Sequence, residues 1–270
     1  MFKSMSHLEQ QLYFTLGERE QRVFTIQDIV NILNISLQHA RNLASNMTKK
    51  NVAERVKAGL FVRIPESVIL DKKQYKEDAI LIAAKSLKNV FLSHYTALSI
   101  HGLAERYTTQ IYVTTLHHQR NMKYHDFHVQ YLTVVPRRFF GMKSMNYSHQ
   151  KISVADQERT ILDTVNKPAY AGGWGELISC FKNLEQINWT ILLTYIKKFN
   201  NKILARRIGY LMDNLKNVSI PRKINKEIKH YSGNNIYYFD STKEGILNPE
   251  WNIIVPKIIR EALHADWKRS

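Results

Sequence analysis

The sequence predicts an α+β chain in which a small helical module with a β-hairpin precedes a larger mixed α/β domain. Three observations support this prediction. Two short segments before residue 50 carry apolar residues at helical spacing. Two runs between residues 110 and 135 are rich in β-branched and aromatic residues, and several apolar helical stripes follow residue 175. We place the two domains at residues 1–70 and 71–270, the second with a small sheet and a helical layer.

Three helices are expected in the first domain. Ser6 with Glu9 forms a capping box that starts the first helix, which Gly17 ends. Thr25 with Asp28 starts the second helix, and "NIS" at 34–36 separates it from the third. The apolar stripe of the third helix consists of Leu37, Ala40, Leu43, Ala44 and Met47. Two short helices joined by a three-residue turn are typical of a helix-turn-helix.

A basic hairpin follows the third helix and completes the pattern of a winged helix-turn-helix. Residues 52–56 and 60–64 read as short strands, with Lys57 and Gly59 in the turn. On the outer face of the third helix, amides suit adenine, an arginine suits guanine, and lysines suit phosphates. We therefore expect DNA binding through Ser36, Gln38, His39, Arg41, Asn42, Ser45, Asn46, Lys49, Lys50, Lys57 and Arg63.

The second domain reads as helices around a few strands. Helices are expected in "AILIAAKSLKN" (79–89) and "HYTALSIHGL" (94–103), the latter with Ser93 as its cap. Strands are expected in "QIYVTTL", "HDFHVQYLTVV" and "KISV", and later in "NIYYFD" and "WNIIVP". Helical patterns fill most of the chain between residues 156 and 215, and "KIIREALHADW" predicts a terminal helix.

The net charge of +16 argues for a polyanionic partner. Residues 197–229 alone hold ten Lys or Arg against two Asp or Glu, a net charge of +8. We expect this block to form the outer surface of the helical layer, with Lys197, Lys198, Lys202, Arg206 and Arg207 as candidate contacts. A solvated surface with no partner is the alternative. With one cysteine and no apolar run long enough to span a bilayer, we expect a cytoplasmic protein without a disulfide or a membrane partner.

The charged segment "DQERTILD" (156–163) looks like an active site, but each polar group has a structural use. Asp156 can cap the helix that follows it, Glu158 suits the helix dipole, and Arg159 and Asp163 share a face. Thr160 can bond back to a carbonyl of its own helix. The histidines at 117, 118, 125 and 128 fit no metal-ligand spacing. We therefore expect no catalytic site, metal or cofactor.

Ser93 and His94 could suggest a nucleophile and its base. Adjacent residues at the start of a helix rarely bring their side chains together, and the chain has no Gly-x-Ser-x-Gly elbow. We expect a structural role for both residues.

Several motifs resemble the AbiEi antitoxin family, the transcriptional regulators of abortive-infection AbiE type IV toxin–antitoxin systems. The most specific is Asp156-x-Glu158-Arg159-Thr160 with Asp163, followed by Pro168 and Gly172-Gly173; "SHYTALSIHGL" and "RRIGYLM" also match. Gln157 departs from the pattern, since relatives commonly carry proline there.

The resemblance covers nearly the whole chain and implies two activities. The first domain would bind inverted repeats of double-stranded operator DNA and repress its own operon. The second would oppose a nucleotidyltransferase-like toxin, or act on its RNA or nucleotide target, without a stable complex being required. The basic block around Lys197 to Arg207 could contact DNA or that RNA or nucleotide target.

Three other functions stay open at this point. The protein could be a stand-alone transcription factor without a toxin partner. It could be a nucleic-acid enzyme delivered to DNA, although no acidic metal-binding cluster is evident. The first domain could also dock another protein instead of DNA.

Overall fold

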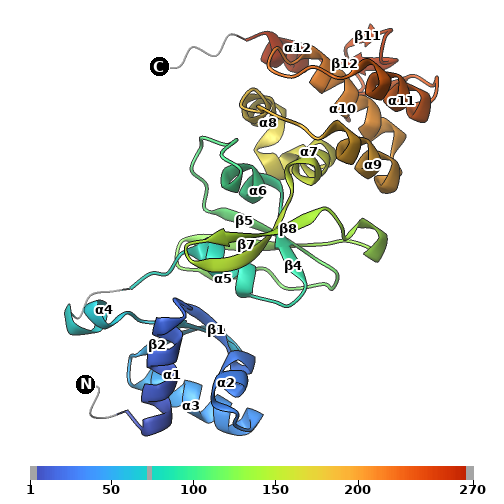
Figure 1. The fold of residues 1–270 in the computed structure, drawn as a ribbon. Helices are drawn as coiled ribbons and strands as arrows, with labels where there is room; N and C mark the ends of the chain where they lie inside the picture. Colours follow the sequence, from blue (N-terminus) through green and yellow to red (C-terminus); the bar gives the residue numbers. More distant parts are fainter. Residues whose placement is uncertain (1–4, 72–74, 266–270) are drawn as a thin grey trace. The chain divides into compact units, whose positions relative to one another are not determined.

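The computed structural model describes residues 5–71 and 75–265 and has a mixed α+β fold (Figure 1). The described chain divides into two compact units. The first contains the residues up to Val90 together with Asn121–Val129 and Ser144–Ser153. The second contains Phe91–Arg120, Gln130–Lys143 and the residues from Val154 onward. The first unit therefore extends past residue 70, where the sequence placed the domain boundary.

The first unit begins with three helices and a small antiparallel sheet. Its elements are α1 (His7–Glu18), β1 (Val23–Thr25), α2 (Ile26–Leu33), α3 (Leu37–Lys49), β2 (Ala53–Lys57), β3 (Leu60–Arg63), α4 (Glu66–Asp71) and α5 (Ala79–Lys85). The strand order is β1-β3-β2, with Phe24 opposite Phe61 and Glu54 opposite Val62. The three helices and the sheet enclose a core that includes Leu12, Phe24 and Met47.

A six-stranded sheet has the order β6-β7-β5-β4-β9-β8. Its strands, which are divided between the two units, are β4 (Val90–Leu92), β5 (Gln110–Thr115), β6 (Met122–Tyr124), β7 (Phe127–Thr133), β8 (Met142–Tyr147) and β9 (Gln150–Ala155). Strands β6 and β7 form an antiparallel pair, whereas β4 runs parallel to β9 with Leu92 opposite Val154.

The second unit is largely helical and ends in a small sheet. Its further elements are α6 (His94–Ile100), η2 (Pro136–Arg138), α7 (Gln157–Asn166), η3 (Pro168–Ala171), α8 (Gly173–Phe181), α9 (Trp189–Phe199), α10 (Lys202–Asn214), α11 (Arg222–Ser232), β10 (Tyr237–Tyr238), β11 (Ile246–Asn248), β12 (Ile253–Val255) and α12 (Lys257–His264). The strand order is β10-β12-β11. A single large core centred on α7, α8 and α10 includes Leu162, Phe181 and Trp251.

The start signals of the helices were predicted correctly. Ser6 and Thr25 both form capping boxes, and Ser36 accepts a hydrogen bond from the backbone of His39. Ser93 occupies the cap position of α6 but makes no side-chain cap hydrogen bond. The predicted helix over 79–89 ends at Lys85, and Asp266 and Trp267 of the predicted terminal helix lie outside the described residues. Strands β1, β4, β6, β8 and β11 and helices α4 and α11 were not predicted.

The charged segment at α7 is held as the sequence predicted. Asp156 caps the helix by accepting from the backbone nitrogen of Arg159 at 2.7 Å, and Thr160 donates to the carbonyl of Asp156. Arg159 forms an ion pair with Asp163 at 2.9 Å, with both side chains buried. The carboxylate of Glu158 also accepts from the backbone of Asn188 at 2.7 Å. These groups are therefore partnered within the fold.

Across residues 5–71 and 75–265, every helix is too short or too polar to span a lipid bilayer.

Candidate nucleic-acid interface

Helix α3 presents a polar face to solvent. Gln38, His39, Asn42 and Asn46 are exposed, and the Gln38 amide donates to that of Asn42 at 3.2 Å. The opposite face is buried through Ala40, Leu43, Ala44 and Met47. Leu37 does not join that face as predicted, because 47% of its surface is exposed at the start of the helix. The helix thus begins with an exposed apolar side chain, that of Leu37, beside the exposed amides of Gln38 and Asn42.

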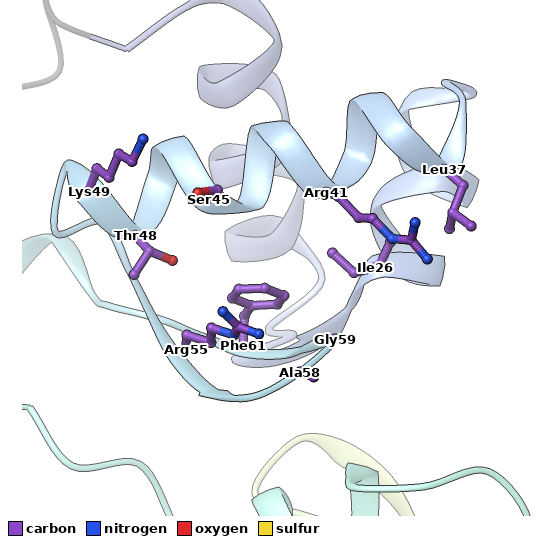
Figure 2. A pocket seen from close by; sticks show the side chains of 10 residues that line it. All are labelled: Ile26, Leu37, Arg41, Ser45, Thr48, Lys49, Arg55, Ala58, Gly59 and Phe61. Atoms are coloured by element: carbon purple, nitrogen blue, oxygen red, sulfur yellow. The ribbon is translucent and has the colours of Figure 1, made fainter.

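A groove of about 650 Å³ lies between α3 and the β2–β3 hairpin (Figure 2). Arg41, Ser45, Thr48 and Lys49 line it from the helix, and Arg55 lines it from β2. Figure 2 shows Ser45 and Thr48 on the side of α3 that faces the hairpin. The apolar part of the lining consists of Ile26, Leu37 and Phe61, and Ala58 and Gly59 complete it. The groove therefore combines hydrogen-bond donors with three cationic side chains.

Arg55 was missed by the sequence analysis as a candidate contact. It is exposed on β2, and it lines the groove opposite the helix. The alternation of strand β2 could have identified it, because the flanking Glu54 and Val56 are less exposed than Arg55. The described residues of the groove include no carboxylate, so its formal charge is positive.

Two predicted phosphate contacts instead hold the first unit together. The ammonium group of Lys50 forms an ion pair at 2.6 Å with Glu9, whose side chain is buried. Burial by itself would raise the pKa of Glu9, but the hydrogen bonds from Lys50 and Ser6 outweigh it and lower that pKa. The guanidinium of Arg63 lies 4.3 Å from the ring centroid of Tyr13, and its Nε donates to the carbonyl of the same residue. Both cations therefore already have partners within the fold, and their contacts with DNA remain a prediction.

Two other predicted DNA contacts, Lys57 and Ser36, have further roles in the structure. Lys57 is the last residue of β2 and not part of the turn, and partial burial lowers the pKa of its ammonium group. The Ser36 hydroxyl accepts a hydrogen bond from the backbone of His39, so its oxygen caps the N-terminus of α3.

The basic block of the second unit is only partly a surface. Lys197, Lys198 and Lys202 are exposed on α9 and α10, and Lys197 pairs with Glu227 at 2.9 Å. Arg206 is 1% exposed, which contradicts the prediction that it lies on the outer surface. Its guanidinium donates to the carbonyls of Trp251, Asn252, Ser232 and Gly233. The prediction failed because these acceptors come from residues far along the chain.

Arg207 is also partly buried. Its guanidinium lies about 6 Å from the ring centroids of Trp174 and Phe239, and burial lowers its pKa. Helix α11 adds further exposed cations to this region, namely Arg222, Lys223 and Lys226.

The side chains of Ser93 and His94 converge, contrary to the prediction. Ser93 Oγ lies 3.0 Å from His94 Nδ1 and accepts from the hydroxyl of Thr114 at 2.8 Å. All three residues are buried. Within the described ranges, no group of three or more His, Cys, Asp or Glu side chains is placed to hold a metal ion.

Comparisons with known proteins define the fold alone. No family model and no curated protein matches the chain. The crystal structure of the RV2827C protein from Mycobacterium tuberculosis is similar, with a TM-score of 0.59 and 12% sequence identity. The match covers 96% of this chain and 94% of that one. The two proteins therefore share a fold over nearly the full length of both chains.

Proposed function

We propose that this protein is a DNA-binding autorepressor and the antitoxin of an AbiE-like type IV toxin–antitoxin system. The groove between α3 and the β2–β3 hairpin is the observation that carries the DNA-binding part. The order α1-β1-α2-α3-β2-β3, with a three-stranded antiparallel sheet, supports a winged helix-turn-helix. In such a module α3 is the recognition helix and the hairpin is the wing.

The geometry divides the candidate residues into two roles. The amides of Gln38 and Asn42 are exposed beside the groove, and Asn or Gln side chains can pair bidentately with adenine. The exposed Leu37 suits the methyl group of thymine, since apolar side chains contact it in the major groove. Arg41 and Lys49 line the groove itself, where a phosphate backbone fits between helix and hairpin.

The charge of the groove supports the same assignment. Arg41, Lys49 and Arg55 supply three cations without a carboxylate among the lining residues. Each phosphate that a cation neutralises releases counterions and steepens the salt dependence of binding. A partner protein would not impose that salt dependence to the same degree, so the two alternatives can be distinguished.

Gel-shift titrations with the DNA upstream of the protein's own gene test this division. Asn42→Ala should weaken specific binding by about 1–3 kcal/mol and leave non-specific binding unchanged. Arg41→Ala and Lys49→Ala should weaken binding to all sequences and each reduce the salt slope by about one. If all three variants behave identically, the assignment of base and phosphate contacts is wrong.

The antitoxin part of the proposal rests on the motif that spans Asp156 to Gly173 and on the basic surface. The exposed Lys202, Lys223 and Lys226 are the residues to reverse, because Arg206 and Arg207 are wholly or partly buried. The proposal predicts a nucleotidyltransferase-type toxin gene beside this one, and co-expression of the full chain with that toxin should rescue growth. The Lys202→Glu, Lys223→Glu, Lys226→Glu variant should rescue less well if this surface faces the toxin or its RNA. Undiminished rescue together with unchanged DNA binding would remove the basic surface from the proposal.

A stand-alone transcription factor is the second candidate function, and it would use the same groove between α3 and the hairpin to bind DNA. It predicts operator binding without any rescue of a toxic neighbour. A nucleic-acid enzyme is a third reading, which turnover of labelled RNA or nucleotides in Mg²⁺ would support, provided that Asp156→Ala with Glu158→Ala abolished it.

A further inference from the structure

The second unit contains a pocket of about 400 Å³ that the proposed function does not use. It lies among η2, α7, the start of α6 and the end of α9, and strand β7 forms one wall. Arg138, Arg159 and Lys167 line it together with one acidic side chain, that of Asp163. With the histidines neutral, its charged groups carry a formal charge of +2. The pocket is within the size range of small-ligand sites.

Arg159 and Asp163 neutralise each other, which leaves Arg138 and Lys167 as the unbalanced charges. The guanidinium of Arg138 lies 4.1 Å from the ring centroid of Phe199, and its buried Nε has no hydrogen-bond partner. Neither Arg138 nor Lys167 has a carboxylate within ion-pair distance among the residues that the structure describes. A partly buried arginine without an anion is costly unless a ligand supplies one.

His94 adds a third donor to the pocket. It adopts a left-handed backbone conformation, with φ at 51°, which is uncommon for a residue other than glycine. Ser93 Oγ accepts from Thr114 and lies 3.0 Å from His94 Nδ1, and in the tautomer in which Ser93 donates to Nδ1 the imidazole proton lies on Nε2. Burial lowers the pKa of His94 to about 4, so the ring stays neutral and can donate without adding charge. Such strained, fixed groups occur at ligand sites.

We propose that this pocket binds a small phosphate monoester through Arg138 and Lys167, with His94 as a further donor. A phosphate monoester carries a charge of about −1.5 to −2 at neutral pH, which matches the charge of the pocket better than a monocarboxylate does. The half-buried ring of Tyr170 also lines the pocket and suits a ligand with a flat apolar part. A nucleoside monophosphate has the required charge, ring and size.

Isothermal titration calorimetry of the full chain with AMP, inorganic phosphate and adenosine tests the proposal. AMP should bind, inorganic phosphate should bind more weakly in competition with it, and adenosine should not bind. Equal binding of adenosine and AMP would overturn the phosphate assignment. Failure of the wild-type protein to bind AMP or phosphate at millimolar concentration would overturn the site itself.

Variants then locate the site. Arg138→Gln and Lys167→Ala should each weaken AMP binding about tenfold or more, as expected for lost hydrogen bonds to a charged group. Arg137→Gln is the matched control, since Arg137 is an exposed neighbouring arginine that does not line the pocket. Lys167 lies exposed at the rim, so its variant tests the site even if Arg138→Gln unfolds the protein. Binding that survives in Lys167→Ala, or that falls equally in Arg137→Gln, would contradict the proposal.

Discussion

Replacing Arg206 by methionine tests how strongly a single buried cation holds the C-terminal sheet to the helices. The guanidinium connects α10 with the carbonyls of Trp251 and Asn252 before β12, and with that of Gly233 after α11. A hydrogen bond to a charged group contributes about 1.5–3 kcal/mol, and the methionine removes three such bonds, although the Asn252 carbonyl keeps its bond from the Tyr237 backbone. Part of this loss is offset because the buried charge itself is removed. We therefore expect the free energy of unfolding to fall by about 4 kcal/mol, at the upper end for one substitution.

Urea unfolding followed by tryptophan fluorescence is the appropriate assay, because all four tryptophans lie between residues 174 and 267. The signal therefore reports on the part of the chain that contains Arg206. Lys202→Met on the same helix is the matched control, since Lys202 is exposed. It should change the free energy of unfolding by less than about 0.5 kcal/mol. A loss below about 1 kcal/mol for Arg206→Met would refute the reasoning that these carbonyls depend on it.

Three further substitutions test the packing and the buried charges. Lys50→Met should destabilise the first unit by about 2 kcal/mol, because it leaves the carboxylate of Glu9 buried without its cation. The pKa of Glu9 is lowered in the folded state, so this stabilisation is present above pH 4.5 and should disappear as the pH falls further. Circular dichroism melts of the wild type and of Lys50→Met at several pH values would show this loss. A stability difference between the two proteins that stays the same at low pH would contradict the reasoning. Gly209→Ala should lower the free energy of unfolding by about 1–3 kcal/mol and alter the tryptophan emission, because the added Cβ overlaps the buried ring of Trp251. Burial lowers the pKa of His94 from 6.5 to about 4, so the unfolded chain takes up a proton that the folded chain excludes. The free energy of unfolding of the second unit should therefore fall by about 2 kcal/mol between about pH 7 and pH 5. In His94→Gln, urea titrations at the two pH values should show a smaller fall.

The helices with local start signals were predictable from the sequence. Ser6, Thr25 and Ser36 each act within three residues of the backbone groups that they cap, so the spacing alone identified them. The same is true of Asp156 and of the Arg159–Asp163 pair one turn apart.

The strands and cations that were missed depend on distant partners. Strand β4 has three residues and is held by β9, more than fifty residues later, so it carries no periodicity of its own. Nothing near Arg63 in the sequence indicates that its guanidinium lies over the ring of Tyr13. Arg206 was assigned to the surface because its carbonyl partners follow it by twenty-six residues or more. Composition and spacing identify a basic face. Only tertiary contacts show which of its cations already bind carbonyls, carboxylates or aromatic rings within the fold.

One pair of variants tests the central claim, that the groove beside α3 receives the DNA backbone. Ser45→Asp places a carboxylate among the groove-lining Arg41, Lys49 and Arg55, where it would repel a phosphate. Ser67→Asp makes the same change at an exposed serine of α4, outside the groove. Fluorescence anisotropy with DNA from upstream of the protein's gene should show Ser67→Asp binding like the wild type and Ser45→Asp binding about a hundredfold more weakly. Wild-type affinity in Ser45→Asp, with the fold intact by circular dichroism, would contradict the assignment of this groove.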